Sequence, residues 1–286
     1  MNDFYTEYKK RIELIDNHMQ KCLKAYNDCE DVLFDSMCYS VFNGGKRIRS
    51  ILCMETARML TGSEKNALAF ATAIEFIHAF SLVHDDLPCM DNADLRRGMP
   101  SCHKKYGEAI ALLAGDALLN TAFEVMADEC EKEGTSAIKA MKSVVRAAGV
   151  HGMINGQIRD IELMASADAT EEKLIRLIEQ KTMALMMTSV ESAALSCNAS
   201  DDIVARLKDF AYNLGIAFQI RDDFEDEEED METEQNSPNF INTLGREKAL
   251  ARMLCHADKA EEILNGFENN EFLKGLLDFL FSQYRN

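Results

Sequence analysis

Residues 64–91 read EKNALAFATAIEFIHAFSLVHDDLPCMD and predict a buried helix that ends in carboxylates. The segment 64–84 is apolar on most of its faces, which is typical of a helix inside a bundle. Asp85 and Asp86 follow directly, and Asp91 comes after a turn at Pro88. Solvation of a helix end explains one or two aspartates, but not their apolar approach. Three carboxylates at one point repel each other unless a divalent cation neutralises them, and hard oxygen ligands suit Mg²⁺.

The composition favours one all-helical domain spanning residues 1–286. The chain is 47% hydrophobic and has only 3 Pro and 14 Gly, too few turn-forming residues for a many-stranded sandwich or barrel. We find no linker that would mark a domain boundary. The 31 basic against 49 acidic residues give a formal charge of −18, so nucleic acid is not an expected partner. If this protein binds phosphates, metal ions must mediate.

The cysteine pattern and the N-terminus predict a cytoplasmic protein. None of the nine cysteines forms a C-x-x-C pair, and free thiols suit a reducing compartment. The first twenty residues are too charged for a signal peptide, and the apolar stretch Ala67 to Phe80 is too short to span a bilayer. Helical periodicity predicts helices at about 5–23, 29–42, 47–60, 64–84, 104–129, 135–162, 170–197, 201–228, 245–265 and 269–284.

A second acidic cluster ends another apolar helix. In the stretch QIRDDFED at 219–226, Asp222 and Asp226 stand four residues apart on one helix face. Like charges at this spacing cost stability, which a bound cation would offset. In a helical bundle, the helices ending near Asp85 and Asp222 can face each other across one cavity.

Basic groups accompany both clusters. Gly44 and Gly45 precede Lys46 and Arg49, and a Gly-Gly turn entering a helix presents backbone N–H groups to an anion. Arg96 and Arg97 are adjacent and suit two different anions. His78 lies two turns before Asp85, and Lys181-Thr182 interrupts an apolar helix, where an ammonium needs an anionic partner. Gln157 and Asp160 are equally consistent with structural roles.

With these motifs together, the sequence resembles the trans-isoprenyl diphosphate synthases, specifically the bacterial farnesyl/geranylgeranyl diphosphate synthase type. The resemblance runs from Asn43 to about Gly245 and rests on these segments: GGKRIR at 44–49, EFIHAFSLVHDDLPCMDNADLRRG at 75–98, GEAIALLAGDALL at 107–119, QKT at 180–182 and FQIRDDFED at 218–226. It implies an all-α, isoprenoid-synthase-type bundle of about ten or more helices around a central cavity, in a homodimer.

The resemblance also implies a role for each motif. Asp85 and Asp91, supported by Asp86, would bind two of about three Mg²⁺ ions, and Asp222 with Asp226 would hold another. Arg96 and Lys181 would hold the allylic diphosphate. Isopentenyl diphosphate would be held by Lys46, Arg49, His78 and Arg97. Thr182 and Gln219 would present oxygen dipoles to the forming carbocation.

The implied reaction is the Mg²⁺-dependent head-to-tail (1′–4) condensation of isopentenyl diphosphate with dimethylallyl or geranyl diphosphate. Phe80, five residues before Asp85 and followed by Ser81, is expected to form the floor of the pocket and to favour a farnesyl product. The alternatives are a geranylgeranyl diphosphate synthase and a weakly active or regulatory subunit of a heteromeric prenyl synthase. The last is motivated by the acidic segment 227–240, which lacks the lysines usual in the family.

Two other classes fit less well. A terpene cyclase of similar architecture would have little use for a second anion site at Lys46, Arg49, His78 and Arg97. A calcium-binding acidic helical protein would explain the acidic run at 222–234, but not the buried helices that lead to the aspartates.

Overall fold

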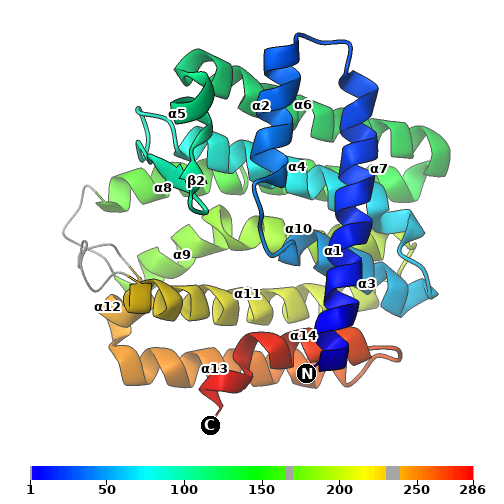
Figure 1. The fold of residues 1–286 in the computed structure, drawn as a ribbon. Coiled ribbons are helices and arrows are strands. Elements are labelled where there is room, and N and C mark those ends of the chain that lie inside the picture. The colour runs from blue at the N-terminus through cyan, green and yellow to red at the C-terminus, as the bar shows by residue number, and fades with distance from the viewer. Residues whose placement is uncertain (1, 165–169, 230–238, 286) are drawn as a thin grey trace.

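The computed structural model describes residues 2–164, 170–229 and 239–285. The fold is all-α, as the composition predicts, and the two short strands form a single hairpin (Figure 1). The α-helices in chain order are α1 (Asn2–Leu23), α2 (Asp31–Phe42), α3 (Ile48–Thr61), α4 (Leu68–Asp85), α5 (Cys102–Tyr106), α6 (Glu108–Glu133), α7 (Thr135–Ala148), α8 (Met153–Met164), α9 (Glu171–Lys181), α10 (Met183–Ser196), α11 (Asp201–Glu229), α12 (Phe240–Leu244), α13 (Arg246–Leu264) and α14 (Glu271–Phe281). The strands are β1 (Leu95–Arg96) and β2 (Met99–Pro100), and the 3-10 turns are η1 (Lys24–Tyr26), η2 (Lys65–Ala67) and η3 (Ser282–Tyr284).

Helix α4 is the centre of the bundle and packs against α3, α6 and α10. Its residues are buried on nearly every face, including Phe70, Ile74, Phe76 and Ile77, which are 0% exposed. This matches the prediction of an internal helix, because a helix that is apolar all round has no face for water. Helix α11 runs roughly parallel to α4 in Figure 1 and packs between α10 and α13. The core therefore surrounds the two helices that carry the aspartate motifs.

Three of the predicted helices are each divided in the structure, two of them after residue 134. The segment predicted as one helix at 135–162 forms α7 and α8, because the chain turns tightly at Gly149–Gly152. A Cβ at Gly152 would lie 2.1 Å from the Ala147 carbonyl oxygen, so only glycine fits this turn. The segment predicted at 170–197 forms α9 and α10, which meet at Thr182.

The third difference is at the start of α6. The predicted helix 104–129 is divided at Gly107, whose φ of +88° favours glycine, so that a short α5 precedes α6. The buried helix predicted from residue 64 also begins later, at Leu68, after the turn η2.

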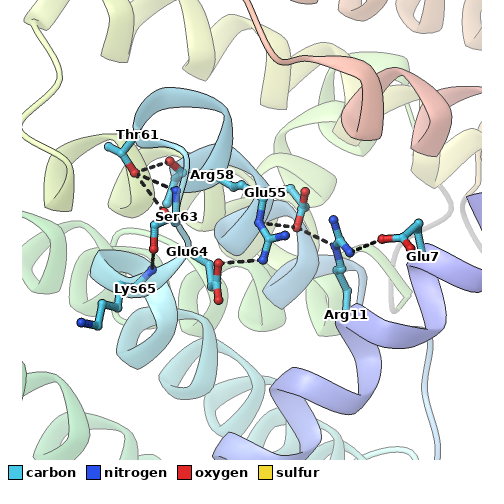
Figure 2. A network of polar contacts seen from close by, with 9 residues as sticks. Glu7, Arg11, Glu55, Arg58, Thr61, Ser63, Glu64 and Lys65 are labelled. Carbon is cyan, nitrogen blue, oxygen red and sulfur yellow. Dashed lines mark hydrogen bonds and ion pairs between the residues drawn. The ribbon is translucent and has the colours of Figure 1, made fainter.

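A polar network fixes α1 to the C-terminal half of α3 (Figure 2). Glu55, 3% exposed, accepts a hydrogen bond from Arg11 Nε at 2.9 Å and pairs with Arg58 Nε at 3.4 Å. Arg11 also binds Glu7, and Arg58 binds Glu64, both at 2.6 Å. Besides Glu55, each of the two arginines is therefore paired with a second carboxylate at the edge of the network. Burial raises the pKa of Glu55, although both arginines oppose this shift.

Two described stretches, Lys65–Asp85 and Glu108–Glu133, are long and apolar enough to cross a membrane by length and composition. The first contains the central helix α4 and is mostly buried by its neighbours, which is the usual state of a core helix. The second stretch is less buried, and one or two such helices are only weak evidence of a membrane span.

Candidate active site

The C-terminal end of α4 opens on an apolar cavity of about 510 Å³. Asp85, Lys181 and Thr182 line this cavity, as does Gln157. Its apolar wall comes from α4, α6, α8 and α10 and contains Phe80, Leu112, Met153, Ile154, Ile158, Ile161 and Leu185. We call this space the apolar cavity. Phe80 and Ser81, the residues expected to limit product length, both line it.

The turn after α4 brings Asp91 back toward Asp85. The Asp91 backbone N–H donates to the Asp85 carbonyl at 2.9 Å, so the chain reverses around Pro88 as the sequence predicts. Burial raises the pKa of Asp85 to about 6; the charge of Lys181 opposes this shift and that of Asp91 adds to it. Asp85 is therefore a desolvated carboxylate that a cation would stabilise.

Asp86 points to different partners from Asp85 and is 2% exposed. Its carboxylate accepts hydrogen bonds from Arg96, with Nε at 3.1 and 3.3 Å and Nη2 at 2.5 Å. The β1–β2 hairpin that carries Arg96 is held by α2, because Tyr39 Oη donates to the Pro100 carbonyl at 2.7 Å and Asn43 Nδ2 donates to the Arg96 carbonyl at 3.2 Å. Asp86 thus orients an arginine.

Lys181 is paired with Asp160 across the junction of α8 and α9. Its Nζ donates to the Asp160 carboxylate. The two helices come this close because of Gly156, where a Cβ would lie 2.3 Å from the Lys181 backbone nitrogen. The structure thus gives the ammonium the anionic partner that the sequence analysis required, and it places Gln157 on the wall of the apolar cavity.

A second cavity, of about 630 Å³, lies where the loop after α2 enters α3. Its lining is Asn43, Gly44, Gly45, Lys46, Arg47, Ile48, Arg49, Glu75, His78, Arg97, Phe218 and Asp222. We call this space the basic cavity. It brings together the four residues expected to bind isopentenyl diphosphate, namely Lys46, Arg49, His78 and Arg97.

The shape of the loop depends on glycine and on Arg97. Arg97 Nη1 donates to the Gly44 carbonyl at 2.5 Å. Gly45 has a φ of +119°, and a Cβ there would lie 2.8 Å from the same Arg97 nitrogen, so a side chain at this position would displace the guanidinium. Arg49 Nε is buried and has no hydrogen-bond partner among the described residues. Burial, with the charges of Arg49 and Arg97, keeps the pKa of His78 well below 6.5, so His78 is neutral at pH 7.

The second acidic cluster is at the C-terminal part of α11. Burial raises the pKa of Asp222 to about 7, against the opposing charges of Arg221 and Lys46. Asp223 has a structural contact instead: it accepts hydrogen bonds from Gln219 Nε2 at 3.0 Å and from the Phe240 backbone N–H at 2.8 Å. Asp226 is exposed. Gln219 is not among the residues that line either cavity.

The two acidic clusters lie at adjoining cavities, and this modifies the expectation of one common space. Asp85 lines the apolar cavity and Asp222 the basic cavity, while His78 and Arg49 line both. These two side chains stand between the cavities because the helices α3 and α4 that carry them pack together. Most of the acidic segment 227–240 lies outside the described residues.

Some contacts that hold the site were not predicted. Tyr8 Oη on α1 donates to the Lys46 carbonyl, and Glu225 pairs with Lys46 Nζ at 3.2 Å. The sequence marks Tyr8 only as one apolar position on a helix stripe. The partners are 38 and 179 residues apart, and local spacing carries no signal at that range.

An apolar cavity that begins at a carboxylate, adjoining a basic cavity within an all-α bundle, defines an enzyme class that handles anionic substrates with apolar chains. The polyprenyl synthetase family model matches residues 30–238. The chain is 33% identical to the farnesyl diphosphate synthase of Bacillus subtilis (strain 168), covering 98% of this chain and 97% of that protein. It is 35% identical to the geranylgeranyl diphosphate synthase of Cyanophora paradoxa, covering 96% and 94%.

A solved apo structure described as an FPP/GFPP synthase from Zymomonas mobilis superposes with a TM-score of 0.88 at 32% identity, covering 97% of this chain and 98% of that one. The chain therefore belongs to the polyprenyl synthetase family. It is a prenyltransferase of the trans-prenyl diphosphate synthase type, and the family's substrates are isopentenyl and allylic diphosphates. Relatives named for farnesyl and for geranylgeranyl products are similar to it at comparable identity.

Proposed function

We propose that this chain condenses isopentenyl diphosphate with dimethylallyl or geranyl diphosphate to give farnesyl diphosphate. One observation carries the proposal: an apolar cavity with Asp85 and Lys181 adjoins a basic cavity, and the two share His78 and Arg49. Two diphosphates can thus be held side by side, with only one hydrocarbon chain entering the apolar wall. A cyclase, which binds a single diphosphate, would not need the second cavity.

The farnesyl product is supported by Phe80. Its ring lines the apolar cavity and packs edge-on against His84, with 4.9 Å between the ring centroids. His84 in turn contacts α6, where its Nε2 lies 3.0 Å from the Leu112 carbonyl oxygen. A ring packed against a side chain that is itself anchored to α6 is a rigid limit to the length of a growing chain.

The carboxylates fit Mg²⁺ by their chemistry. Asp85 and Asp222 are hard oxygen donors whose pKa values burial raises, so both gain from a cation. The described residues contain no group of three or more His, Cys, Asp or Glu side chains that could hold a metal by themselves, so the three carboxylates expected at one point after α4 do not converge there. Asp85 and Asp91 would hold two ions, and Asp222 with Asp226 a third. Bound Mg²⁺ would supply neutralisation of the negative charge that develops on the leaving diphosphate.

The side chains of this protein then have separable tasks. Arg96, fixed by Asp86, and Lys181 would hold the allylic diphosphate, and the apolar wall would exclude water from the allylic carbocation. Thr182, which also lines the apolar cavity, would present its hydroxyl oxygen to that cation. His78 would bind the other diphosphate through a ring N–H, beside Arg49 and Arg97. The C3–C4 double bond of isopentenyl diphosphate would attack C1 of the cation, and the released diphosphate would accept the proton.

We also propose a homodimer. Several large apolar side chains on α6 and α8 are about half exposed. Leu113 lies outside the apolar cavity, and four others line it: Leu112, Ile154, Ile158 and Ile161. A second copy would remove them from water. Light scattering after size exclusion should give twice the monomer mass, and a monomer at micromolar concentration would contradict this.

The experiment that tests the function is a set of incubations. Purified protein with Mg²⁺ and isopentenyl diphosphate should release diphosphate when dimethylallyl or geranyl diphosphate is added, and chromatography should show a C15 product. A C20 product would favour a geranylgeranyl synthase. No diphosphate release with dimethylallyl, geranyl or farnesyl diphosphate would exclude an independent synthase and leave the heteromeric-subunit alternative.

A further inference from the structure

Lys46 of the basic cavity has a carboxylate partner on helix α11. Its Nζ lies 3.2 Å from Glu225 Oε2. Glu225 is in the DDFED motif on α11, one turn beyond Asp222, and it is not one of the residues expected to bind metal. The two side chains are 56% and 34% exposed, so the pair faces solvent at the rim of the cavity.

Glu225 is held in place from the α11 side. Its other carboxylate oxygen accepts a hydrogen bond from Arg221 Nη2. Arg221 is only 6% exposed at its side chain, and its guanidinium lies 5.3 Å from the ring centroid of Phe218. A buried arginine therefore presents Glu225 to Lys46.

The backbone of Lys46 does not depend on Glu225. Tyr8 Oη binds the Lys46 carbonyl from behind, and Arg97 binds the Gly44 carbonyl. The loop therefore has two anchors of its own. Because of these anchors, Glu225 is not needed to shape the anion-binding loop, and its main effect there is its charge.

That charge is large relative to the local balance. Four cationic side chains (Lys46, Arg47, Arg49 and Arg97) and two carboxylates (Glu75 and Asp222) line the basic cavity, a formal charge of +2. Arg221 and Glu225 at the rim add one charge of each sign, so the formal charge stays at +2 and would be +3 without Glu225. The cations near the apolar cavity have other carboxylate partners, since Lys181 binds Asp160 and Arg96 binds Asp86. The effect of Glu225 should therefore be confined to the basic cavity.

We propose that Glu225 is the counter-ion that isopentenyl diphosphate displaces from Lys46, so that residue 225 sets the affinity for this substrate and not for the allylic one. The proposal rests on the proposed function, which assigns the basic cavity to isopentenyl diphosphate. The diphosphate and the Glu225 carboxylate compete for the same ammonium group. Removing the carboxylate should tighten binding of the diphosphate.

The test is Glu225→Gln, which keeps an oxygen acceptor for Arg221 but removes the charge. Calorimetric titration with isopentenyl diphosphate alone, at low salt, should give a Kd about threefold to tenfold lower than that of the unaltered chain. The difference should shrink in high salt. In steady-state assays the KM for isopentenyl diphosphate should fall by a similar factor, while the KM for geranyl diphosphate stays within about twofold.

Glu191→Gln is the matched control. It removes a carboxylate that accepts from Lys208 Nζ at 3.0 Å, and Lys208 lies on α11 about 20 Å before Asp222. This variant should bind isopentenyl diphosphate like the unaltered chain. Glu225→Asp keeps the charge but shortens its reach toward Lys46, and it should tighten binding by about twofold; it carries the test if Glu225→Gln does not fold.

Each outcome is decisive. Equal or weaker binding of isopentenyl diphosphate by Glu225→Gln, when the unaltered chain binds it, overturns the counter-ion role and leaves the proposed function standing. An equal improvement in Glu191→Gln overturns it too, because the effect would then be one of net charge. Failure of the unaltered chain to bind isopentenyl diphosphate at all overturns both.

Discussion

Replacing Asp85 with Asn should make the protein more stable while abolishing its turnover. The pKa of Asp85 is raised from 3.8 to about 6, chiefly by burial. A carboxyl group whose pKa is higher in the folded state makes the fold less stable once it ionises, so the cost is absent below about pH 4 and complete above about pH 6. About two pKa units at about 1.4 kcal/mol each give about 3 kcal/mol. Since the group is partly exposed, we expect a gain of about 1–2 kcal/mol for the uncharged Asn.

The assay is denaturant unfolding in buffer with a chelator. At pH 8 Asp85→Asn should exceed the unaltered chain in its free energy of unfolding, and the difference should vanish as the pH falls toward about 4. The other two aspartates of the motif are controls. Asp86→Asn weakens a buried ion pair with Arg96 and should cost about 1–3 kcal/mol, whereas exposed Asp91→Asn should stay within about 0.5 kcal/mol. A loss of stability in Asp85→Asn at pH 8, or the same change in all three variants, would refute the reasoning.

Three further predictions concern the pocket, the α1–α3 network and a histidine. Phe80→Ala should lengthen the product by one isoprene unit or more, since the ring lines the apolar cavity, and an unchanged product in chromatography would discard Phe80 as its floor. Glu55→Ala leaves Arg11 and Arg58 without their shared buried partner (Figure 2) and should lower the free energy of unfolding by about 2–4 kcal/mol. The control Glu64→Ala, whose side chain is 24% exposed at the edge of the network, should lower it by under about 1 kcal/mol. Equal losses in thermal or denaturant unfolding would contradict this prediction. Burial, with the charges of Lys259 and Arg252, lowers the pKa of His256 to about 4, so the free energy of unfolding decreases as the pH falls from about 6.5 to about 4. In denaturant unfolding over that range, the free energy of unfolding of His256→Gln should change by about 1–2 kcal/mol less than that of the unaltered chain. An equal change in the two proteins would count against the prediction.

The sequence predicts the buried helix before Asp85 and the return of Asp91 because both depend on local patterns. A long apolar run fixes burial on all sides, and Pro88 fixes a turn within a few residues. The four residues of the anion site also come together as the motifs indicate, although Arg97 is far along the chain from Lys46. Here the resemblance to a family supplied what spacing alone could not.

The breaks at Gly152 and Thr182 could not be predicted from the helical period. The segments on both sides of each break keep an apolar stripe, so the helical pattern of the sequence continues across the break. The tight turn at Gly149–Gly152 separates α7 from α8, and Gly156 then allows α8 to approach the Lys181 backbone. The same approach brings Asp160 to Lys181, an ion pair that depends on tertiary packing and therefore has no local signal.

The pairing of charges bears on how the proposed site would bind two diphosphates in a chain of formal charge −18. Three of the cations expected to bind substrate are paired with carboxylates, Arg96 with Asp86, Lys181 with Asp160 and Lys46 with Glu225. These pairs differ in exposure, because Asp86 is buried whereas Glu225 is about one third exposed. Separating a buried carboxylate from its cation costs much free energy, so a buried partner keeps the cation oriented. Separating an exposed pair costs little, so a substrate anion can replace an exposed carboxylate. The buried pair should therefore persist when substrate binds, and the exposed pair should open, which makes the Lys46 contact the adjustable one.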